Sequence, residues 1–305
     1  MLVYALRRIL YLIPVVVGVS IVSFALLRFI PGDPAVVLAG VGATQADLDG
    51  IRQEYGLDQP LPVQYLTYVS HALQGDLGIS IRTRDPVART LFTRLQLTIQ
   101  LTLASMALAT TLGIFAGVMA ATHHNSWLDT GIMVTSLAGI SLPGFWLGLL
   151  LLVVFAGMLH WLPAGGSGTP QHLILPAIVL GASGAAVIAR MTRASILDVI
   201  RQDYLRTLRA NGVSEQLIIY KHALRNALNP VITVIGLEFG FLLGGAVTVE
   251  SVFALPGVGM LMVNAIFNRD YPVVQGGMLV IASLFVLVNL FTDLVYGLVN
   301  PRIRY

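Results

Sequence analysis

The most constraining feature of this chain is the length of its stretches without charged residues. No Asp, Glu, Lys or Arg occurs between Arg8 and Arg28, between Arg94 and Asp129, or between Asp129 and Arg190. Charged residues make up 11% of the chain, whereas an ordinary soluble domain carries about 25%. A membrane-spanning helix needs about 20 mostly apolar residues, and disordered chains are poor in apolar residues. The chain is therefore predicted to be a polytopic membrane protein.

Six segments are long and apolar enough to satisfy their own backbone hydrogen bonds within hydrocarbon. A signal peptide is the alternative for the first segment, because Arg7 and Arg8 precede it. Its apolar run of about 20 residues exceeds a typical signal-peptide core, so we interpret it as a retained anchor. The prediction is an all-α fold with six transmembrane helices, at residues 9–30, 97–121, 130–159, 173–195, 226–249 and 273–297.

The positions of Lys and Arg predict the orientation, because cytoplasmic loops of membrane proteins carry an excess of these residues. With the N-terminus in the cytoplasm, eleven of the 18 Lys and Arg residues lie on or near the cytoplasmic side. Six spans then return the basic tail, residues 300–305, to the same side. Both termini are therefore predicted to be cytoplasmic.

Two hydrophilic segments organise the chain into predicted parts. Residues 1–30 form the cytoplasmic N-terminus and the first span, residues 31–95 form an external cap, and residues 96–305 form the transmembrane core. A structureless loop as long as the cap is unusual, and within it residues 45–55 and 62–73 have helical character. The cap is either a purely structural cover or a docking surface, or lid, for a soluble partner.

The second hydrophilic segment, residues 196–225, is predicted to form two short helices in the cytoplasm. Asn211 and Gly212 can end the first helix, since both tolerate the left-handed conformation, and Ser214 can cap the second. A loop that merely follows the positive-inside rule is the alternative. Apolar residues on such helices would be exposed outside the bilayer and would need a protein surface to cover them. These residues are Leu205, Leu208, Leu217 and Ile218.

The sequence holds no recognisable motif for catalysis or for metal binding. The only lysine, Lys221, is not preceded by the glycines of a phosphate-binding loop, so ATP hydrolysis by that route is not expected. The absence of Cys excludes thiolate metal sites and Cys nucleophiles. His123 and His124 are adjacent, face different directions on a helix and lack a nearby carboxylate pair. We therefore expect no catalytic, cofactor-binding or metal-binding residues and no nucleic-acid partner.

Motifs along the whole chain carry a family resemblance. The run DYLRTLRANG at residues 203–212, the run ESVFALPGVG at 250–259 and the run RDYP at 269–272 occur in order, after PGDP, LDQP and GDLG upstream. Together they resemble the permeases of ABC importers of the dipeptide, oligopeptide and nickel family. Arg206 and Leu208 depart from the coupling-loop signature of that family, which has an acidic residue and an alanine there, whereas Gly212 matches it.

The resemblance implies a fold, a set of partners and a location. It implies the type I ABC-importer permease fold in a bacterial inner membrane, paired with a second homologous permease and surrounded by membrane lipid. Two ATPase subunits, which hold ATP and Mg, would each receive a coupling helix, and an external binding protein would deliver substrate. The coupling residues that it implies, within about 203–222, are Tyr204, Leu205, Arg206, Leu208, Arg209, Gly212, Leu217 and Ile218.

The resemblance leaves the substrate open. Di- and oligopeptides are the first expectation, with glutathione or a nickel chelate as alternatives. An integral-membrane enzyme is a different class, but the chain lacks paired intramembrane catalytic residues. A secondary transporter driven by proton entry at Glu238 is a third class. The external cap and the coupling-type loop argue against it.

Glu238 stands out because it lies near the middle of the fifth predicted span. It is two residues from Gly236 and from Gly240, which places it about 200° around the helix from both. A carboxylate at mid-bilayer should face a partner or a wet cavity. Glu238 is therefore predicted to line the translocation path, and a buried, hydrogen-bonded or protonated Glu is the alternative.

Other residues inside the predicted spans have expected roles in bending and packing. Pro143 is expected to bend the third span or to open its backbone ladder beside the path. Asp293 is expected to pair with Arg190 or Arg193. Glycines spaced four apart favour close approach of helices, and those expected to serve this purpose are Gly113, Gly117, Gly236, Gly240 and Gly244.

Overall fold

The computed structural model describes residues 2–29, 34–39, 43–54 and 56–299. Residues 31–33 of the PGDP motif and the basic tail at 300–305, from which a cytoplasmic C-terminus is predicted, lie outside the described residues. The side chains of Arg7, Arg8 and Asp293 are likewise not described. Apart from one isolated bridge between Ile79 and Pro86, the described residues contain no β structure.

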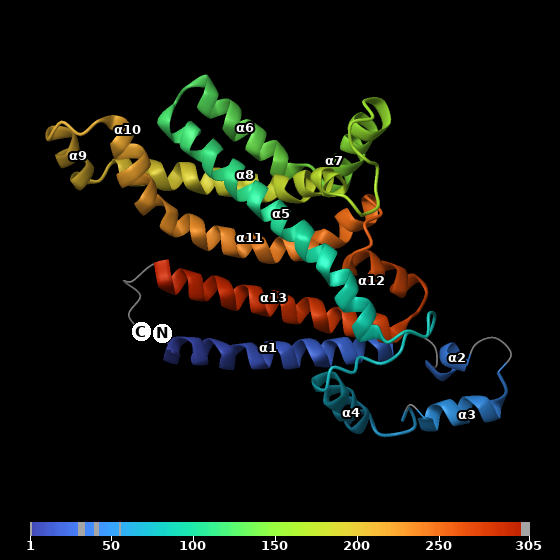
Figure 1. Ribbon diagram of the computed structural model, residues 1–305. Helices are drawn as coiled ribbons and strands as arrows, with labels where there is room; N and C mark the ends of the chain where they lie inside the picture. The colour runs from blue at the N-terminus through green and yellow to red at the C-terminus, as the bar shows by residue number, and fades with distance from the viewer. Residues whose placement is uncertain (1, 30–33, 40–42, 55, 300–305) are drawn as a thin grey trace. The chain divides into compact units, whose positions relative to one another are not determined.

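The predicted all-α fold is confirmed (Figure 1). Short π-helical segments, η1 and η3, and a 3₁₀ turn, η2, continue some of the α-helices. The elements are α1 (Leu2–Phe29), α2 (Pro34–Ala39), α3 (Gln45–Glu54), α4 (Leu61–Leu73), α5 (Val87–Thr122), α6 (Trp127–Ser141), α7 (Gly144–Leu151), η1 (Leu152–Met158), η2 (Pro170–Leu173), α8 (Ile174–Ile200), α9 (Asp203–Ala210), α10 (Glu215–Leu217), η3 (Ile218–Ala223), α11 (Leu224–Val252), α12 (Val258–Phe267) and α13 (Tyr271–Val299).

Four helices are long and apolar enough to cross a membrane. They cover Val87–Thr122, Pro170–Ile200, Glu215–Val252 and Tyr271–Thr292, and a bent helix pair would make a fifth span. The helix α1 occupies the place of the first predicted span, but only some of its side chains are described. By this measure, the described residues account for four or five of the six predicted spans.

The third predicted span, 130–159, is not one straight helix. α6 ends before Pro143, and α7 begins after it, so that the two halves are bent by 104°. Leu142 is extended, with φ −78° and ψ 128°, because a residue before proline is disfavoured in the helical region. The bend predicted at Pro143 is confirmed, and the bent pair is either one broken span or a re-entrant loop.

The described chain divides into two compact units. Unit 1 comprises residues 1–5, 97–260 and 287–305, and unit 2 comprises residues 6–96 and 261–286. The residues predicted as a separate cap, 31–95, therefore group with most of α1 and with the start of α13.

Unit 1 is organised around α8, with α5, α6 and α11 beside it (Figure 1). Its largest core joins Leu101 of α5, Leu180 of α8 and Leu242 of α11 with Phe253 and Leu255 beyond the end of α11. α8 is therefore apolar on several sides, as expected for a helix enclosed by neighbours.

Glycines let α5 lie directly on α8. A Cβ atom at Gly113 would lie 2.7 Å from Ile188 Cβ, and one at Gly117 would lie 2.5 Å from Thr192 Cβ. Both distances are too short for real side chains, so larger residues at these positions would force the helices apart. The two glycines thus occupy positions that permit close packing, as their spacing predicts.

The glycines of α11 differ among themselves. A Cβ atom at Gly236 would overlap Thr292 of α13, and Gly240 is buried. Gly244 is exposed, and a Cβ atom there would meet no atom within 4 Å. The prediction of a packing role for Gly244 is therefore wrong within this chain, because the neighbouring Gly245 faces α8, where a Cβ atom on it would lie 3.0 Å from Leu180 Cδ1.

Unit 2 contains the two helices predicted within 31–95, now seen as α3 and α4. Thr44 and Asp47 cap the start of α3, since Asp47 Oδ2 accepts hydrogen bonds from the amide and the hydroxyl of Thr44. α4 lies against α1, where Tyr65 OH is 2.8 Å from Ser20 Oγ and its ring meets Phe24 edge-on.

Candidate functional site

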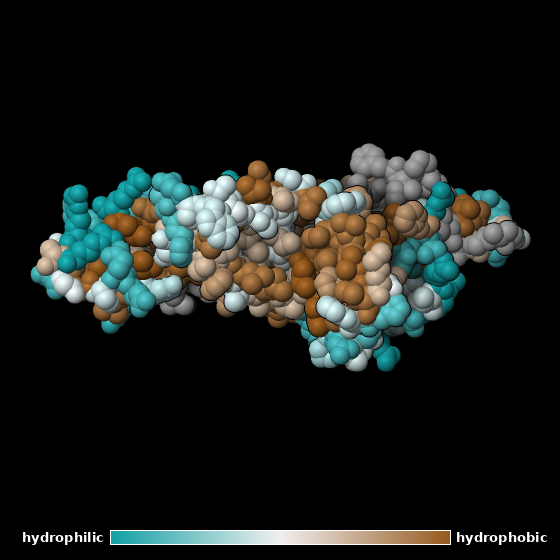
Figure 2. All heavy atoms as spheres, turned by 90° about the horizontal axis from the view of Figure 1, so that it is seen from above, coloured by the Kyte–Doolittle hydropathy of each residue, from teal (hydrophilic) through white to brown (hydrophobic). Residues whose placement is uncertain are grey.

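A compact helical hairpin, residues 203–223, lies at one end of unit 1. It consists of α9, a turn, α10 and η3, and it connects α8 to α11 (Figure 1). Side chains at this end are mainly hydrophilic, whereas those over the adjoining spans are mainly hydrophobic (Figure 2). The hairpin coincides with the segment at about 203–222 for which the sequence predicts a coupling role.

The apolar residues of the hairpin are largely covered by the chain itself. Leu205 and Ile218 are 0% exposed, and Leu208 packs against the same cluster. Val118 of α5 and Ile196 of α8 belong to the same cluster. The prediction that these apolar residues await a partner is therefore wrong for all but Leu217, which is 44% exposed. Helix ends that meet beneath the hairpin cover the others.

This packing makes the hairpin a rigid extension of three spans. The cluster joins Leu205 and Ile218 to α5, to α8 and, through Ala227, to α11. A polar contact adds to it, because Asn226 Nδ2 donates to Tyr204 OH at 2.7 Å. A force applied to the hairpin would therefore reach all three helices.

The turn of the hairpin has the predicted left-handed residue. Gly212 has φ +77°, and its amide donates to Arg209 O at 3.0 Å. Ser214 occupies the position before α10, and its carbonyl accepts from the Ile218 amide at 3.0 Å. Its hydroxyl makes no capping hydrogen bond, so the predicted side-chain cap is absent.

An ion pair closes the surface of the hairpin across this turn. Arg209 Nη2 and Nε donate to the two carboxylate oxygens of Glu215 at 2.7 and 3.0 Å. The hydrogen-bonded carboxylate raises the pKa of Arg209 above its usual value. Arg206 is exposed and lies 3.9 Å from Asp203. The outward side of the hairpin therefore carries charged side chains together with Tyr204 and Leu217.

Glu238 on α11 faces α8. Its Oε2 lies 3.4 Å from the position that a Cβ atom on Gly184 would take. The side chain is half-buried, and no hydrogen bond joins it to another described residue. The small residue at 184 leaves the space that the carboxylate occupies. Glu238 therefore lies between two helices of unit 1 as an unpaired polar group.

Glu250, twelve residues further along α11, is a buried polar site that was not predicted from the sequence. It is 0% exposed and accepts hydrogen bonds from Thr98 Oγ1 at 2.6 Å and from the Met260 amide at 3.1 Å. A Cβ atom at Gly257 would overlap its carboxyl group. The cluster of glycines after Glu250 in the sequence is the signal that could have indicated a close approach of backbone to this carboxylate.

A second polar site missed from the sequence joins α6 to α8. Arg193 Nε and Nη2 donate to the two oxygens of Asp129 at 2.6 and 2.7 Å, and the Asn125 amide donates to Oδ2 at 3.1 Å. Asp129 is 3% exposed. Arg193 therefore has its carboxylate partner on α6, and the expected partner Asp293 is among the side chains not described.

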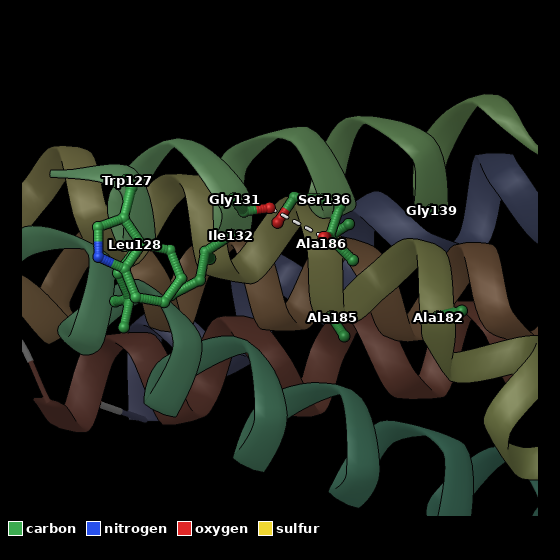
Figure 3. Close-up of a pocket in the computed structure, with 10 residues that line it drawn as sticks. Trp127, Leu128, Gly131, Ile132, Ser136, Gly139, Ala182, Ala185 and Ala186 are labelled. Carbon is green, nitrogen blue, oxygen red and sulfur yellow. Dashed lines mark hydrogen bonds between the residues drawn. The ribbon is translucent and has the colours of Figure 1, made fainter. Parts of the chain in front are cut away.

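A groove of about 450 Å³ lies between α6 and α8 (Figure 3). Trp127 stands at its rim, and Thr135, which donates to Gly131 O at 2.8 Å, is one of its two hydroxyl-bearing lining residues. None of its lining residues is charged. The groove therefore lacks the groups that would recognise an ionised substrate, and neither Glu238 nor Pro143 lines it.

These observations define the class of the protein. Long apolar helices, one of them broken by 104°, enclose a mid-helix carboxylate, and a rigid polar hairpin extends from one end of three of them. The described residues hold no group of three or more His, Cys, Asp or Glu side chains that could bind a metal ion. The architecture is that of a membrane permease subunit.

The chain belongs to a defined family of such permeases. Residues 113–305 match the family described as "Binding-protein-dependent transport system inner membrane component", and residues 1–102 match its companion, "Binding-prot-dependent transport system membrane comp, N-term". It is an ABC-importer permease, as the resemblance in its sequence indicates.

Curated relatives match the chain from end to end. The chain is 48% identical over 305 residues, covering 100% of both chains, to the "Glutathione transport system permease protein GsiC" of Escherichia coli strain K12. The protein of the same name from Shigella dysenteriae serotype 1 is equally similar, at 48% identity over the full length of both chains.

Solved structures share the fold. An inward-facing MetNI methionine ABC transporter matches 69% of this chain and 96% of its own with a TM-score of 0.61 and 18% sequence identity. An amino acid ABC transporter with histidines matches 70% of this chain and 94% of its own, with a TM-score of 0.53 and 16% identity. At this identity the likeness extends to the fold alone.

Proposed function

We propose that this chain is the permease subunit of an ATP-driven importer for glutathione or closely similar short peptides. The observation that carries the proposal is the 48% identity to glutathione permeases across the whole of both chains. Di- and oligopeptides are the first expectation from the sequence, and the shortest of them share the zwitterionic character and the size of glutathione. The glutathione alternative is thus preferred over longer peptides and over a nickel chelate.

The proposed assembly follows from what this chain contains and what it lacks. It would pair with a second homologous permease in the bacterial inner membrane and receive substrate from an external binding protein. Two ATPase subunits would supply the ATP and Mg chemistry, because the sequence has no phosphate-binding loop of the Walker type. Purified alone, the chain is expected to show no ATPase activity.

The hairpin at residues 203–223 is the proposed docking element for one ATPase subunit. Its exposed Tyr204, Arg206 and Leu217 would contact that subunit, while Leu205 and Ile218 fasten it to the spans. This arrangement supports a lever role, since movement of the docked ATPase would be passed to α5, α8 and α11 together. It also implies that the hairpin and both termini lie in the cytoplasm and that α3 and α4 lie outside.

Glu238 is the proposed polar group of the translocation path. It is half-buried, lacks a described hydrogen-bond partner and faces the small residue Gly184. An intramembrane carboxylate is costly unless it meets water or a cation, and the ammonium group of a passing peptide would meet that need briefly. The attraction must stay weak, because a tightly held substrate would not leave.

Uptake measurements test the proposal directly. The complete transport system, with this chain, its partner permease, ATPases and binding protein, is produced in cells without glutathione import of their own. We expect ATP-dependent accumulation of radiolabelled glutathione that unlabelled glutathione abolishes. A complex with inactivated ATPase subunits is the matched control and should accumulate none.

Competition identifies the substrate class. Excess dipeptide or nickel chelate should leave glutathione uptake largely unchanged if glutathione is the substrate. Uptake of dipeptide but not of glutathione by an assembled complex would show the peptide alternative to be right. Glutathione uptake that persists with inactivated ATPases and follows a proton gradient would overturn the importer class itself.

A further inference from the structure

Two loops of unit 2 are fastened together by a buried aspartate. Asp270, which is 5% exposed and precedes α13, accepts a hydrogen bond from Ser80 Oγ at 2.5 Å and one from the Ile81 amide at 3.1 Å. Arg82 Nη1 donates to Asn268 Oδ1 in the same region. The loop at residues 79–86 is thereby held against the loop that joins α12 to α13 (Figure 1).

Exposed arginines gather on these two loops. Arg82, Arg84 and Arg269 lie on the loops themselves, and Arg89 follows in the first turn of α5. We call these four residues the arginine patch. Within the described part of the chain, none of them forms an ion pair with a carboxylate. Asp85 is the one exposed carboxylate on the two loops, since Asp270 is turned inward.

The backbone holds two of these arginines in an unfavourable conformation. Arg84 has φ +61° and Arg269 has φ +55°, both in the left-handed region that favours glycine. The Arg84 amide donates to Ser80 O at 3.0 Å, and the Arg269 amide donates to Ile266 O at 3.1 Å. Such strained positions persist where the surroundings determine them, and they gather at functional sites. A glycine would serve these turns better if only the turns mattered.

We propose that the arginine patch is a docking surface for an acidic face of the external binding protein that delivers substrate. The inference rests on the proposed function, which places unit 2 loops on the external side. The guanidinium group of arginine forms bidentate hydrogen bonds with carboxylates. Arginine is also enriched among the interface residues that contribute most to protein–protein binding. Phe267, which is 83% exposed beside Asn268, adds the aromatic character of such contacts.

The rigidity of the loops distinguishes this partner from lipid. Phospholipid headgroups are met by mobile Lys and Arg side chains that reach the interface from helix ends. Binding of lipid headgroups does not require that two loops be held together by a buried carboxylate. It also does not require that two arginines adopt the left-handed backbone conformation. A free small anion is also a poor fit, because exposed single charges are screened by salt. A protein surface with several carboxylates meets all four arginines together.

Binding-protein titrations on the assembled transporter in nanodiscs test the patch. The readout is ATPase activity stimulated by increasing concentrations of the binding protein of the same transport system. The double variant Arg84→Gly/Arg269→Gly removes two charges while easing both backbone positions, so misfolding is not the expected consequence. We expect the half-saturating concentration to rise about tenfold, since steering by charge raises association rates about tenfold or more. The maximal ATPase rate should stay the same.

Salt and charge controls make the test specific. Raising NaCl should weaken the wild-type interaction steeply and the double variant only slightly, because salt screens exposed charges. Arg52→Gln, on α3 of the same unit and paired with Asp49 at 2.7 Å in the native chain, removes one charge away from the patch and should change nothing.

Three results would overturn the docking proposal. The first is a double variant whose half-saturating concentration of binding protein equals that of the wild type. The second is an effect that appears only in nanodiscs with anionic phospholipid and disappears in phosphatidylcholine. The third is an altered half-saturating concentration of glutathione with binding-protein affinity unchanged. The proposed function fails separately, if the wild-type complex is not stimulated by its binding protein or takes up no glutathione.

Discussion

The two ends of α11 are held by different chemistry. At its start, Ala227 packs in an apolar cluster with Leu205 and Ile218 of the hairpin. At its other end, Glu250 is buried and takes directed hydrogen bonds from Thr98 Oγ1 and the Met260 amide. Apolar contacts are non-directional, whereas a buried polar group that loses its partner carries the full desolvation cost.

The two ends of α11 are therefore expected to differ in how far they can move. The hairpin end is held mainly by apolar contacts, with the hydrogen bond from Asn226 to Tyr204 beside them, so the hairpin and the ends of the spans can move together as one body. The hydrogen bonds of Glu250 fix the other end of α11 in distance and angle to α5 and to the start of α12. We expect this end to stay in place when the hairpin end moves. We therefore expect substitutions at Glu250 to damage the fold, and substitutions on the hairpin surface to damage coupling.

The largest expected effect is that of Glu250→Ala. It leaves the Thr98 hydroxyl and the Met260 amide buried without an acceptor, and each such group costs about 1–3 kcal/mol. We expect the free energy of unfolding to fall by about 4 kcal/mol, measured by equilibrium unfolding in detergent. Glu250→Gln keeps one acceptor oxygen and should lose less. Equal stability of the alanine variant and the wild type would show that the hydrogen bonds of Glu250 do not fix this end of α11.

Leu205→Ala tests the apolar end. Leu205 is 0% exposed, and truncation of a buried leucine costs about 2–5 kcal/mol through lost burial and the cavity left behind. Leu217→Ala, at a site 44% exposed, is the control and should cost less than about 1 kcal/mol. If both variants melt at the same temperature, the hairpin is not fastened to the spans as described.

Gly212→Leu distinguishes the effect of backbone strain at the hairpin turn from the effect of contact with the ATPase subunit. The residue has φ +77°, and a Cβ atom there would meet no atom of this chain within 4 Å. Only the left-handed backbone penalty applies within the chain, about 1–2 kcal/mol, and Gly212→Asn should cost less. Transport per ATP hydrolysed should nevertheless fall for the leucine variant, because its side chain projects toward the docked ATPase. Normal coupling by an assembled leucine variant would remove the hairpin turn from the proposed interface.

Arg209→Ala tests the surface of the hairpin. The pair with Glu215 is part-exposed, at 35% and 55% for the two side chains, and such pairs contribute about 0.2–1 kcal/mol. The loss of stability should vanish in about 1 M salt, where charges are screened within about 3 Å. A larger loss that persists in high salt would show that Arg209 acts through packing and not through charge.

The smallest effect on stability is expected at Glu238, between the two ends. Glu238→Gln keeps shape and removes charge, so the free energy of unfolding should change by no more than about 0.5 kcal/mol. Glutathione uptake should fall severalfold. The chain has no cysteine, so Glu238→Cys also allows labelling with a water-soluble thiol reagent. Absence of labelling in nucleotide-free and ATP-trapped complexes, with normal uptake by Glu238→Gln, would show a buried structural carboxylate.

Features with a local cause were predictable from sequence. The helices α8 and α11 begin and end within a few residues of the predicted 173–195 and 226–249. The left-handed turn at Gly212 and the break at Pro143 were also predictable, because each depends on the conformational range of one or two residues. The family resemblance rested on motifs of the same local kind.

Features that depend on distant partners were not predictable in this way. The sequence predicts that Leu205 and Ile218 are exposed on a short polar hairpin, yet the ends of α5 and α8 cover them. Arg193 pairs with Asp129, 64 residues away in the sequence, and Thr98 donates to Glu250 across 152 residues. A single sequence does not state which of several carboxylates an arginine or a threonine will meet.

Apolar segments, turn residues and family motifs predict a helical membrane permease with a hairpin at one end of its spans and a glutamate in mid-span. The length of an apolar segment and the preference of residues for turns are local properties, so they can be predicted without knowing the fold. The packing of the helices shows that Glu250 is hydrogen-bonded, whereas Glu238 has no hydrogen-bond partner among the described residues. Both are glutamates on one apolar helix, and their roles differ because burial and hydrogen-bond partners are properties of the packed helices and not of α11 alone.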